Sequence, residues 1–512
     1  MPRRPKARDG LSAGERVALY QAEMEEKRRR MDLQSAAAQK EEKIRDSDAD
    51  INRTVSAKEK KALPKPQHAV VKVDFSIPTG RIKPMHAMCN GPKSYGADLS
   101  PLFSEIGVPY VRFDETDGAF SSCAIDVSRI FKDMNADPNS EESYDFSQSD
   151  KYIAAAYNSG ARVIYRLGES RDKSFGEKEI QVPDDLSLYC KICANIVKHY
   201  NDYWANGYAY GIQYFEIWNH AKKRGDFARE YELYRRVAEA IKLIDENLLV
   251  GGMLFDDFSD SAREFIKLCR KNRTPIDFLS FSSRSNDPLK VGETVKTAIA
   301  FLKNFGFENT KIILGEWCYI DSDATGGAAY QRLIGPEFDG MTKKSFFDSL
   351  SSVKGAAYDA ALMLHLNEIP DVDIACHYDA QPYISPWCDF ADRFGNRQKP
   401  FYAFKAYGEL YRAKNGVFCS SEQTDGLRHS GVYAAAAVSD EGIGYCLLAS
   451  FDGCTVVDLR LDEIPDDLYS ADIFMLDGVK NMTLADTVPL SGLKKRLLLN
   501  ISEYGAVLIK LY

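Results

Sequence analysis

The chain has 512 residues, more than one ordinary core needs, so two or three folded units are expected. Its composition, 45% hydrophobic and 12% aromatic, is that of a globular protein with large cores. A formal net charge of -9 argues against nucleic acid as the main partner, because phosphate binding needs a concentrated basic surface.

Residues 1–66 are rich in Lys, Arg, Glu and Ala, with runs such as MEEKRRRM and almost no aromatic residues. A segment of this kind cannot bury a core of its own, so we expect a charged extension that is helical or disordered. A mobile tail is favoured over an arm that contacts a partner or a second copy of the chain.

The first residues of the chain are basic, but the apolar stretch that a secretory signal needs does not follow them. No segment approaches the ~20 apolar residues of a membrane span. We therefore expect neither a signal nor a membrane partner. The 11 cysteines are scattered through apolar segments, which indicates reduced, buried thiols and a cytoplasmic protein. Cys190 and Cys193 form a CxxC within an amphipathic helical pattern, and because no second pair stands at zinc spacing we predict no metal site there.

Residues 67–411 alternate short apolar runs with amphipathic segments of helical length, such as FAREYELYRRVAEAIKLIDEN. This is the pattern of parallel strands covered by helices. Eight such units specify a closed (β/α)8 TIM barrel, in which active sites lie at the carboxyl ends of the strands. The predicted strands are residues 82–89, 109–115, 161–168, 214–219, 248–255, 276–283, 311–318 and 373–380.

Residues 412–512 change to alternating strands such as GVYAAAAVS, GYCLLASFD and AVLIKLY, punctuated by Gly, Asp and Asn. No long helical pattern intervenes. We predict an antiparallel, sandwich-like β domain packed against the barrel.

Two of the predicted barrel strands end in carboxylates beside tryptophans. The fourth ends in EIWNH (216–220) and the seventh in GEWCY (315–319). Retaining hydrolysis of a glycoside needs two carboxyl groups about 5–5.5 Å apart, one as nucleophile and one as acid and then base. Strand ends that face each other across a barrel mouth can supply such a pair. Glu216, in mid-strand, is instead expected to form an ion pair with Arg112 inside the barrel.

The stretch from about Ile82 to Tyr411 resembles glycoside hydrolase family 39, the β-xylosidases and α-L-iduronidases of a large clan of retaining barrel enzymes. The resemblance rests on IKPMHAMCNGP, PYVRFDE, RIFKDMNADP, YRLG, HYNDYWANG, YGIQYFEIWN, LGEWCY, HYDAQPY and KPFYAFKAYGELY, in this order. It implies that Glu316 is the nucleophile and that Asn219 contacts the sugar 2-hydroxyl. The acid/base position, a glutamate in the family, is His220 here.

Other strand ends also depart from the family pattern. The sixth reads SFSSR (280–284), where a Trp-His and a Tyr are usual, and the second reads RFDE (112–115), where Arg-x-His-Asp is usual. An imidazole can act as general acid or base near neutral pH, so His220 is one candidate for that role. The carboxyl groups that can replace the missing glutamate are Asp114, Glu115 and Glu169.

The barrel mouth also offers residues that would bind a sugar. Tyr378 and Asp379 are expected to position the substrate at the end of the eighth strand. Trp218 and Trp317 either stack on sugar or belong to the core, and the sequence leaves both alternatives open. The predicted substrate-binding set is Asn219, Trp218, Trp317, His86, Asp114, Glu115, Glu169, Arg284, Tyr319, Tyr378 and Asp379.

Three hypotheses remain open. The first is a retaining O-glycosidase that forms a glycosyl-enzyme on Glu316. The second is a homologue of such enzymes that binds saccharide without turnover, as the loss of the acid/base glutamate suggests. The third is a scaffold that docks through residues 1–66. The first two have a saccharide or glycoside as ligand, and none requires a cofactor or a metal.

Overall fold

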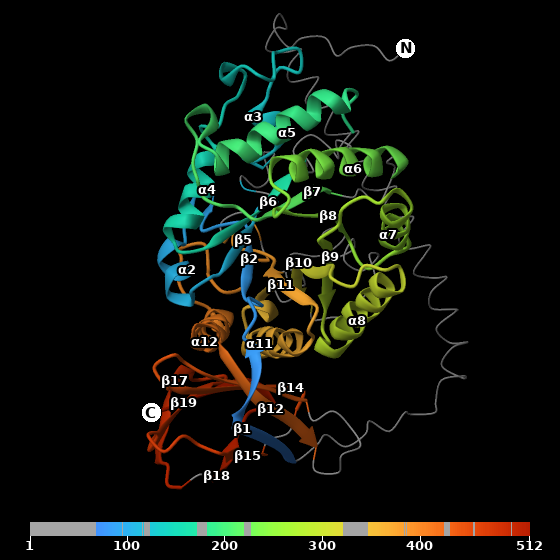
Figure 1. The fold of residues 1–512 in the computed structure, drawn as a ribbon. Coiled ribbons are helices and arrows are strands. Elements are labelled where there is room, and N and C mark those ends of the chain that lie inside the picture. Colours follow the sequence, from blue (N-terminus) through green and yellow to red (C-terminus); the bar gives the residue numbers. More distant parts are fainter. Residues whose placement is uncertain are drawn as a thin grey trace, which may run out of the picture. The chain divides into compact units, whose positions relative to one another are not determined.

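The chain divides into two compact units, Met1–Pro64 and Lys65–Tyr512. The computed structural model describes residues 68–94, 96–114, 116, 123–170, 182–219, 227–320, 347–382, 385, 387–423, 431–453, 456–492 and 494–512. The predicted extension, residues 1–66, lies outside this part of the chain. The described residues form a (β/α)8 barrel and a β-sheet domain (Figure 1).

All eight predicted barrel strands are confirmed. They are parallel and close into a barrel in the order β10-β11-β2-β5-β6-β7-β8-β9. Their near-continuous apolar sequences suit a sheet that is covered on both faces. Their bounds are Ala87–Cys89 (β2), Tyr110–Arg112 (β5), Arg162–Leu167 (β6), Tyr214–Asn219 (β7), Leu249–Phe255 (β8), Phe278–Ser285 (β9), Lys311–Tyr319 (β10) and Val372–His377 (β11).

Helices surround the barrel and cover the outer face of its strands (Figure 1). Several begin at side-chain caps, as where the Asp185 carboxylate accepts from the Leu188 amide. The first helix ends at Gly107, whose left-handed backbone suits glycine. The bounds are Ser100–Ile106 (α2), Val127–Ile130 (α3), Ser149–Asn158 (α4), Leu186–Asn201 (α5), Phe227–Ile244 (α6), Asp260–Asn272 (α7), Pro288–Asn304 (α8), Val353–Glu368 (α11) and Lys399–Ala413 (α12).

The predicted C-terminal antiparallel domain is also confirmed, as a nine-stranded sheet in the order β17-β16-β19-β14-β13-β12-β1-β15-β18. Every neighbouring pair is antiparallel except β1 and β15. The bounds are His68–Arg81 (β1), Asn415–Gln423 (β12), Val432–Val438 (β13), Gly444–Phe451 (β14), Val456–Asp462 (β15), Ser470–Leu476 (β16), Asn481–Pro489 (β17), Lys495–Asn500 (β18) and Tyr504–Leu511 (β19). A short hairpin of Lys93–Ser94 (β3) and Ala97–Asp98 (β4) stands apart from both sheets.

The placement of β1 corrects the sequence prediction, which assigned residues 67–411 to the barrel. Residues 68–81 instead pair with β12 on one side and with β15 on the other. In this strand, buried Val71 and Val73 alternate with the more exposed Lys72. Such alternation is typical of a strand in a sheet that has one face toward a core. That period does not reveal which sheet the strand joins.

The two faces of the β-sheet pack against different partners. One face encloses its own core, to which both ends of the sheet contribute, for example Leu459 of β15 and Ile473 of β16. The sheet therefore curls around that core. The opposite face, which includes Leu447 and Leu508, joins the hydrophobic core of the barrel domain and contacts α11 and α12.

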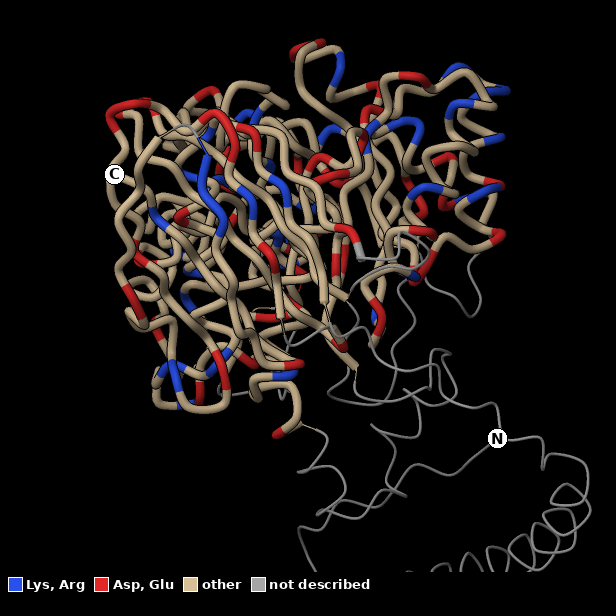
Figure 2. Tube along the Cα trace, turned by 90° about the horizontal axis from the view of Figure 1, so that it is seen from below, with Lys and Arg blue, Asp and Glu red and all other residues tan. Residues whose placement is uncertain are grey.

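Charged residues of both signs are interspersed along the described chain (Figure 2). Within the described segments, no helix combines the length and the apolarity that a membrane crossing requires.

Candidate active site

Glu316 lies at the carboxyl end of β10, where its side chain faces the barrel interior and is 5% exposed. Its Oε2 is 2.6 Å from Arg284 Nη2 and accepts from the Ser282 hydroxyl at 3.3 Å. Its Oε1 is 3.4 Å from Arg112 Nη1. The carboxylate therefore contacts two cations at once.

Arg112 ends β5 and is fully buried at the centre of this cluster. Its Nη2 is 2.6 Å from Glu216 Oε2, which confirms the predicted ion pair inside the barrel. Gly315, next to Glu316, leaves room for Leu254 and Ser280, since a Cβ at that position would lie 2.6 Å from Leu254 Cδ1 and 2.6 Å from Ser280 Oγ. Burial alone would lower the pKa of Arg112, but the charges of Glu216 and Asp114 raise it well above its usual range.

Asp114 and Asn219 connect the ends of β5 and β7. The Asn219 amide donates to Asp114 Oδ1 at 2.7 Å, and its own carbonyl oxygen accepts from Arg112 at 3.4 Å. Asp114 Oδ1 also lies 3.5 Å from Arg166 Nε. The two predicted residues are therefore brought together with Glu316 around one guanidinium.

Glu169 follows β6 and accepts from the Ser128 amide at 3.0 Å and from the Ser128 hydroxyl at 2.6 Å. Burial, together with the nearby charge of Asp126, raises the pKa of Glu169 to about 7. This carboxyl group thus retains its proton over part of the neutral range. Its two oxygens are also occupied by Ser128, in the first turn of α3.

Tyr378 and Asp379 directly follow β11. The guanidinium of Arg284 lies over the Tyr378 ring, 5.5 Å from its centroid, and the Tyr378 amide donates to the Trp317 carbonyl. Asp379 is almost fully buried. Tyr378 therefore joins the Glu316 cluster through Arg284, one of the residues at the predicted sixth strand end.

Four predicted residues lie elsewhere. The Trp218 ring contacts Tyr189 of α5, and the Trp317 ring packs near Phe404 of α12, so both indoles belong to the core outside the barrel wall. Tyr319 packs against Tyr358 and Phe451, toward the β-sheet. His86 precedes β2 and contacts Gly107, Tyr407 and Tyr411, and burial lowers its pKa to about 3.

His220 and Glu115, two further predicted site residues, lie outside the described residues.

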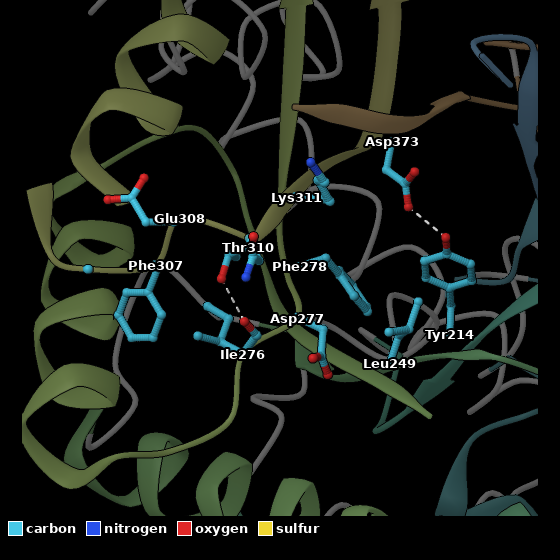
Figure 3. A pocket seen from close by; sticks show the side chains of 12 residues that line it. Tyr214, Leu249, Ile276, Asp277, Phe278, Phe307, Glu308, Thr310, Lys311 and Asp373 are labelled. Carbon is cyan, nitrogen blue, oxygen red and sulfur yellow. Dashed lines mark hydrogen bonds between the residues drawn. The ribbon is translucent and has the colours of Figure 1, made fainter. Parts of the chain in front are cut away.

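A cavity of about 580 Å³ opens at the opposite end of the barrel (Figure 3). It is lined by residues at the amino ends of the strands, including Tyr214, Leu249 and Lys311. The Tyr214 hydroxyl donates to Asp373 there at 2.6 Å. Because barrel active sites lie at the carboxyl ends, this cavity is separate from the Glu316 cluster.

The sequence analysis overlooked a buried group formed by Asp359, His377 and Asp389. A signal for it exists, because Asp359 is a lone carboxylate in VKGAAYDAALMLHL, a helix that is apolar on nearly all sides. Such a helix is buried all round, so a carboxylate in its middle must be neutralised in the interior.

Comparison with known proteins points to one family. Residues 97–298 match the model of glycosyl hydrolases family 39. A beta-xylosidase from Geobacillus stearothermophilus is 25% identical over 207 residues, which span 37% of this chain and 38% of that relative.

Solved structures share the fold. A glucosidase from Croceicoccus marinus has a TM-score of 0.70 at 19% identity, covering 87% of this chain and 99% of that one. The GH39 enzyme from Xanthomonas axonopodis pv. citri has a TM-score of 0.61 at 15% identity, covering 89% and 99%. The family model and the beta-xylosidase confirm the predicted resemblance to glycosyl hydrolases family 39, and the solved structures share the fold.

Proposed function

We propose that this chain hydrolyses an O-glycosidic bond with retention of configuration, with Glu316 as the nucleophile. The observation that carries the proposal is a nearly buried carboxylate at the carboxyl end of β10, in contact with Arg112 and Arg284. The two guanidinium groups favour the ionised form that a nucleophile needs. The family assignment supports a glycosidase.

In the proposed reaction, a Glu316 oxygen attacks the anomeric carbon while the bond to the leaving oxygen breaks. That oxygen takes a proton from the general acid. Water then attacks the glycosyl ester and gives a proton back to the same group, which now acts as base. Glu316 leaves as a carboxylate, and the sugar retains its configuration.

The acid/base role is proposed for His220, with a carboxyl group as the alternative. Among the described candidates, Glu169 is supported by a pKa of about 7, which leaves it a proton to donate near neutral pH. Asp114 is less suited, because it accepts from Asn219 and faces Arg112 and Arg166, all of which favour its ionised form.

Aryl glycosides with good leaving groups test the nucleophile, since they reduce the need for a general acid. Xylosides and glucosides come first, because the relatives above are a beta-xylosidase and a glucosidase. We expect Glu316→Gln to lower kcat/KM by about 10³-fold or more. Glu308→Gln makes the same change at the opposite end of the barrel and should leave the rate unchanged. Equal background release by wild type and Glu316→Gln on all sugars would rule the proposal out.

A second candidate function is saccharide binding without turnover. It is favoured by the contacts of Glu316, since each of its two oxygens already lies against a guanidinium group, at 3.4 Å from Arg112 and 2.6 Å from Arg284. Here wild type binds a saccharide but does not cleave it, and His220→Glu gains hydrolysis. Isothermal titration with the sugar, followed by a product assay on both proteins, separates the two functions.

We also propose a reducing compartment such as the cytoplasm. The ten cysteines of the described residues are all free thiols, which supports this location. Contact with a partner or a second copy through residues 1–66 is likewise a proposal. Light scattering of the full chain and of residues 67–512 tests it, because an unchanged mass and unchanged sugar binding would exclude that role.

A further inference from the structure

Asp359, His377 and Asp389 meet behind the barrel wall, outside the Glu316 cluster. Asp359 lies on α11, which packs against β10 and β11. His377 ends β11, and Asp389 lies in the segment that leads to α12. None of the three side chains is more than 2% exposed.

The three side chains converge closely enough to share one ion. A ligand atom of each lies within 4.8 Å of the ligand atoms of the other two. His377 Nε2 is 3.2 Å from Asp389 Oδ2. Metal–ligand bonds of about 2.0–2.2 Å place neighbouring tetrahedral ligands about 3.3–3.6 Å apart, so this hydrogen-bonded pair has to separate only slightly to hold an ion. The Asp359 carboxylate lies within 4.8 Å of both partners and has to approach them to complete the set of three ligands.

The polar atoms of this group are largely unsatisfied. Among the described residues, no hydrogen-bond partner is found for either carboxylate oxygen of Asp359, for Oδ1 of Asp389 or for Nδ1 of His377. In the described part of the chain, no lysine or arginine forms an ion pair with either aspartate. Buried carboxylates without a partner are costly, so a proton or a cation has to neutralise them.

The surroundings favour retention of a proton when no cation is bound. Burial, with a further contribution from the charge of Asp389, raises the pKa of Asp359 well above its usual range. A metal ion that binds here displaces that proton. The two states therefore differ in whether Asp359 carries a proton or a metal.

We propose that Asp359, His377 and Asp389 form a binding site for a divalent transition-metal ion of the Zn²⁺ type. One imidazole and two carboxylates suit Zn²⁺ or Mn²⁺, whereas Ca²⁺ and Mg²⁺ prefer oxygen ligands alone. Three protein ligands leave one position for water. The ion would join α11, β11 and the following segment behind Trp317, whose ring lies 4.8 Å from that of His377. Its role would be to hold the strand end that carries Glu316.

The test begins with metal content. Tag-free, full-length protein is dialysed against Zn²⁺ and then against metal-free buffer, and zinc is measured by plasma mass spectrometry. We expect about one Zn²⁺ per chain and a Tm that is about 5 °C or more higher than after treatment with a chelator. Less than about one tenth of an equivalent of both Zn²⁺ and Mn²⁺, with a Tm unaffected by either ion, would overturn the proposal.

The variant Asp359→Asn separates a bound metal from a bound proton, because asparagine has the shape of a protonated aspartate. With a metal site, the variant loses the zinc and its Tm no longer responds to chelator. If a proton neutralises the group, the wild type and the variant show the same Tm with and without zinc. Asp150→Asn is the control, since it alters another His–Asp pair, in which buried His199 lies 3.0 Å from the partly exposed Asp150, and it should retain the zinc.

If Asp359→Asn does not fold, X-ray absorption of the zinc-loaded wild type still tests the proposal, because it identifies the atoms bound to the zinc. We expect a ligand shell of nitrogen and oxygen atoms. Sulfur in the shell would place the ion on cysteines instead and would contradict the site.

Discussion

Arg112 illustrates how much one residue can organise inside a barrel. Its guanidinium contacts Glu216 at 2.6 Å and reaches Glu316, Asn219 and Asp114 at 3.4–3.8 Å. A planar group with five donors can serve more acceptors, and in a more fixed geometry, than the three donors of a lysine ammonium group. The positions of three strand ends around the proposed nucleophile therefore depend on one side chain.

Replacement of Arg112 by Met should destabilise the fold by about 3–5 kcal/mol, because Glu216 is left as an uncompensated buried charge. Urea denaturation followed by circular dichroism measures the change. The double variant Arg112→Met/Glu216→Gln should recover part of the loss. Arg263→Met, which removes the exposed pair with Asp260, should change the unfolding free energy by less than about 1 kcal/mol. A similar loss in both single variants would contradict this account.

Glu169 should make stability depend on pH. Its pKa is raised to about 7 in the folded protein from an ordinary value of 4.5, so the folded state holds the proton more tightly than the unfolded state. Stability is then lost as pH rises from about 4.5 through 7. Glu169→Gln cannot ionise, so its stability relative to wild type should rise by about 1–3 kcal/mol between pH 5 and pH 8.5.

Thermal unfolding of both proteins at the two pH values checks this prediction. Glu232→Gln is a control of opposite sign, because hydrogen bonds from Arg235 lower the pKa of Glu232 to about 2. That variant should lose stability relative to wild type as pH rises from about 2 to about 4.5, and the difference should stay nearly constant between pH 5 and pH 8.5. If the difference in stability between Glu169→Gln and wild type does not change with pH, the Glu169 carboxyl is ionised throughout this range.

At the scale of single residues, the sequence predicts which residues lie at a strand end better than it predicts where their side chains point. Glu316, Asn219 and Asp114 are found together, as expected of residues at strand ends. Trp218 and Trp317 are adjacent to them in sequence but pack outside the barrel. Trp218 has a positive φ of 67°, and β10 has a register irregularity before Glu316, so simple alternation fails at these strand ends. Sequence periodicity carries no signal for such local backbone changes.

Gly408 on α12 is a point where two elements pack with no space for a side chain. A Cβ at this position would meet the Ile106 carbonyl oxygen of α2 at 1.9 Å. The helix therefore tolerates a glycine that costs it about 1 kcal/mol in propensity. Close approach of α12 and α2 depends on this residue.

Gly408→Ala should consequently destabilise the protein by about 1–3 kcal/mol or more, despite the better helix propensity of alanine. Gly478→Ala, where nothing lies within 4 Å, should be neutral or slightly stabilising. Chemical denaturation of the two variants compares them directly. A stabilising effect of Gly408→Ala would mean that α12 moves away from α2 without cost.

The elements that the sequence identifies are those with strong apolar patterns. Each barrel strand is a short apolar run between helical segments, and all eight are found. In contrast, β17 has almost no buried residue, so no apolar alternation marks it. Residues 68–81 (β1) have the alternation of a strand but are not among the predicted strands, and local periodicity gives no sign of their pairing with the distant β12 and β15.

At the scale of the whole molecule, the barrel and the β-sheet share a core. Leu447 and Leu508 of the sheet belong to the same hydrophobic cluster as the helices α11 and α12. The sheet also takes its strand β1 from the amino side of the barrel. Neither part is complete without the other.

The barrel and the sheet should therefore unfold in one cooperative transition. Differential scanning calorimetry of residues 67–512 should give a single peak, with a calorimetric enthalpy equal to the van't Hoff enthalpy. Residues 415–512 expressed alone lack β1 and should not fold, which circular dichroism can measure. Two separate transitions, or a folded C-terminal fragment, would contradict the shared core.

The position of β1 also has a consequence for synthesis on the ribosome. This strand is translated before the barrel, whereas its neighbours β12 and β15 follow several hundred residues later. At about 5–20 residues per second, the strand waits on the order of tens of seconds for its partners. Lys72 and Asp74 interrupt its valines, and such charges discourage pairing with other nascent chains in the interval. The sheet is therefore the last part of the molecule to close, although its first strand is made before anything else in the fold.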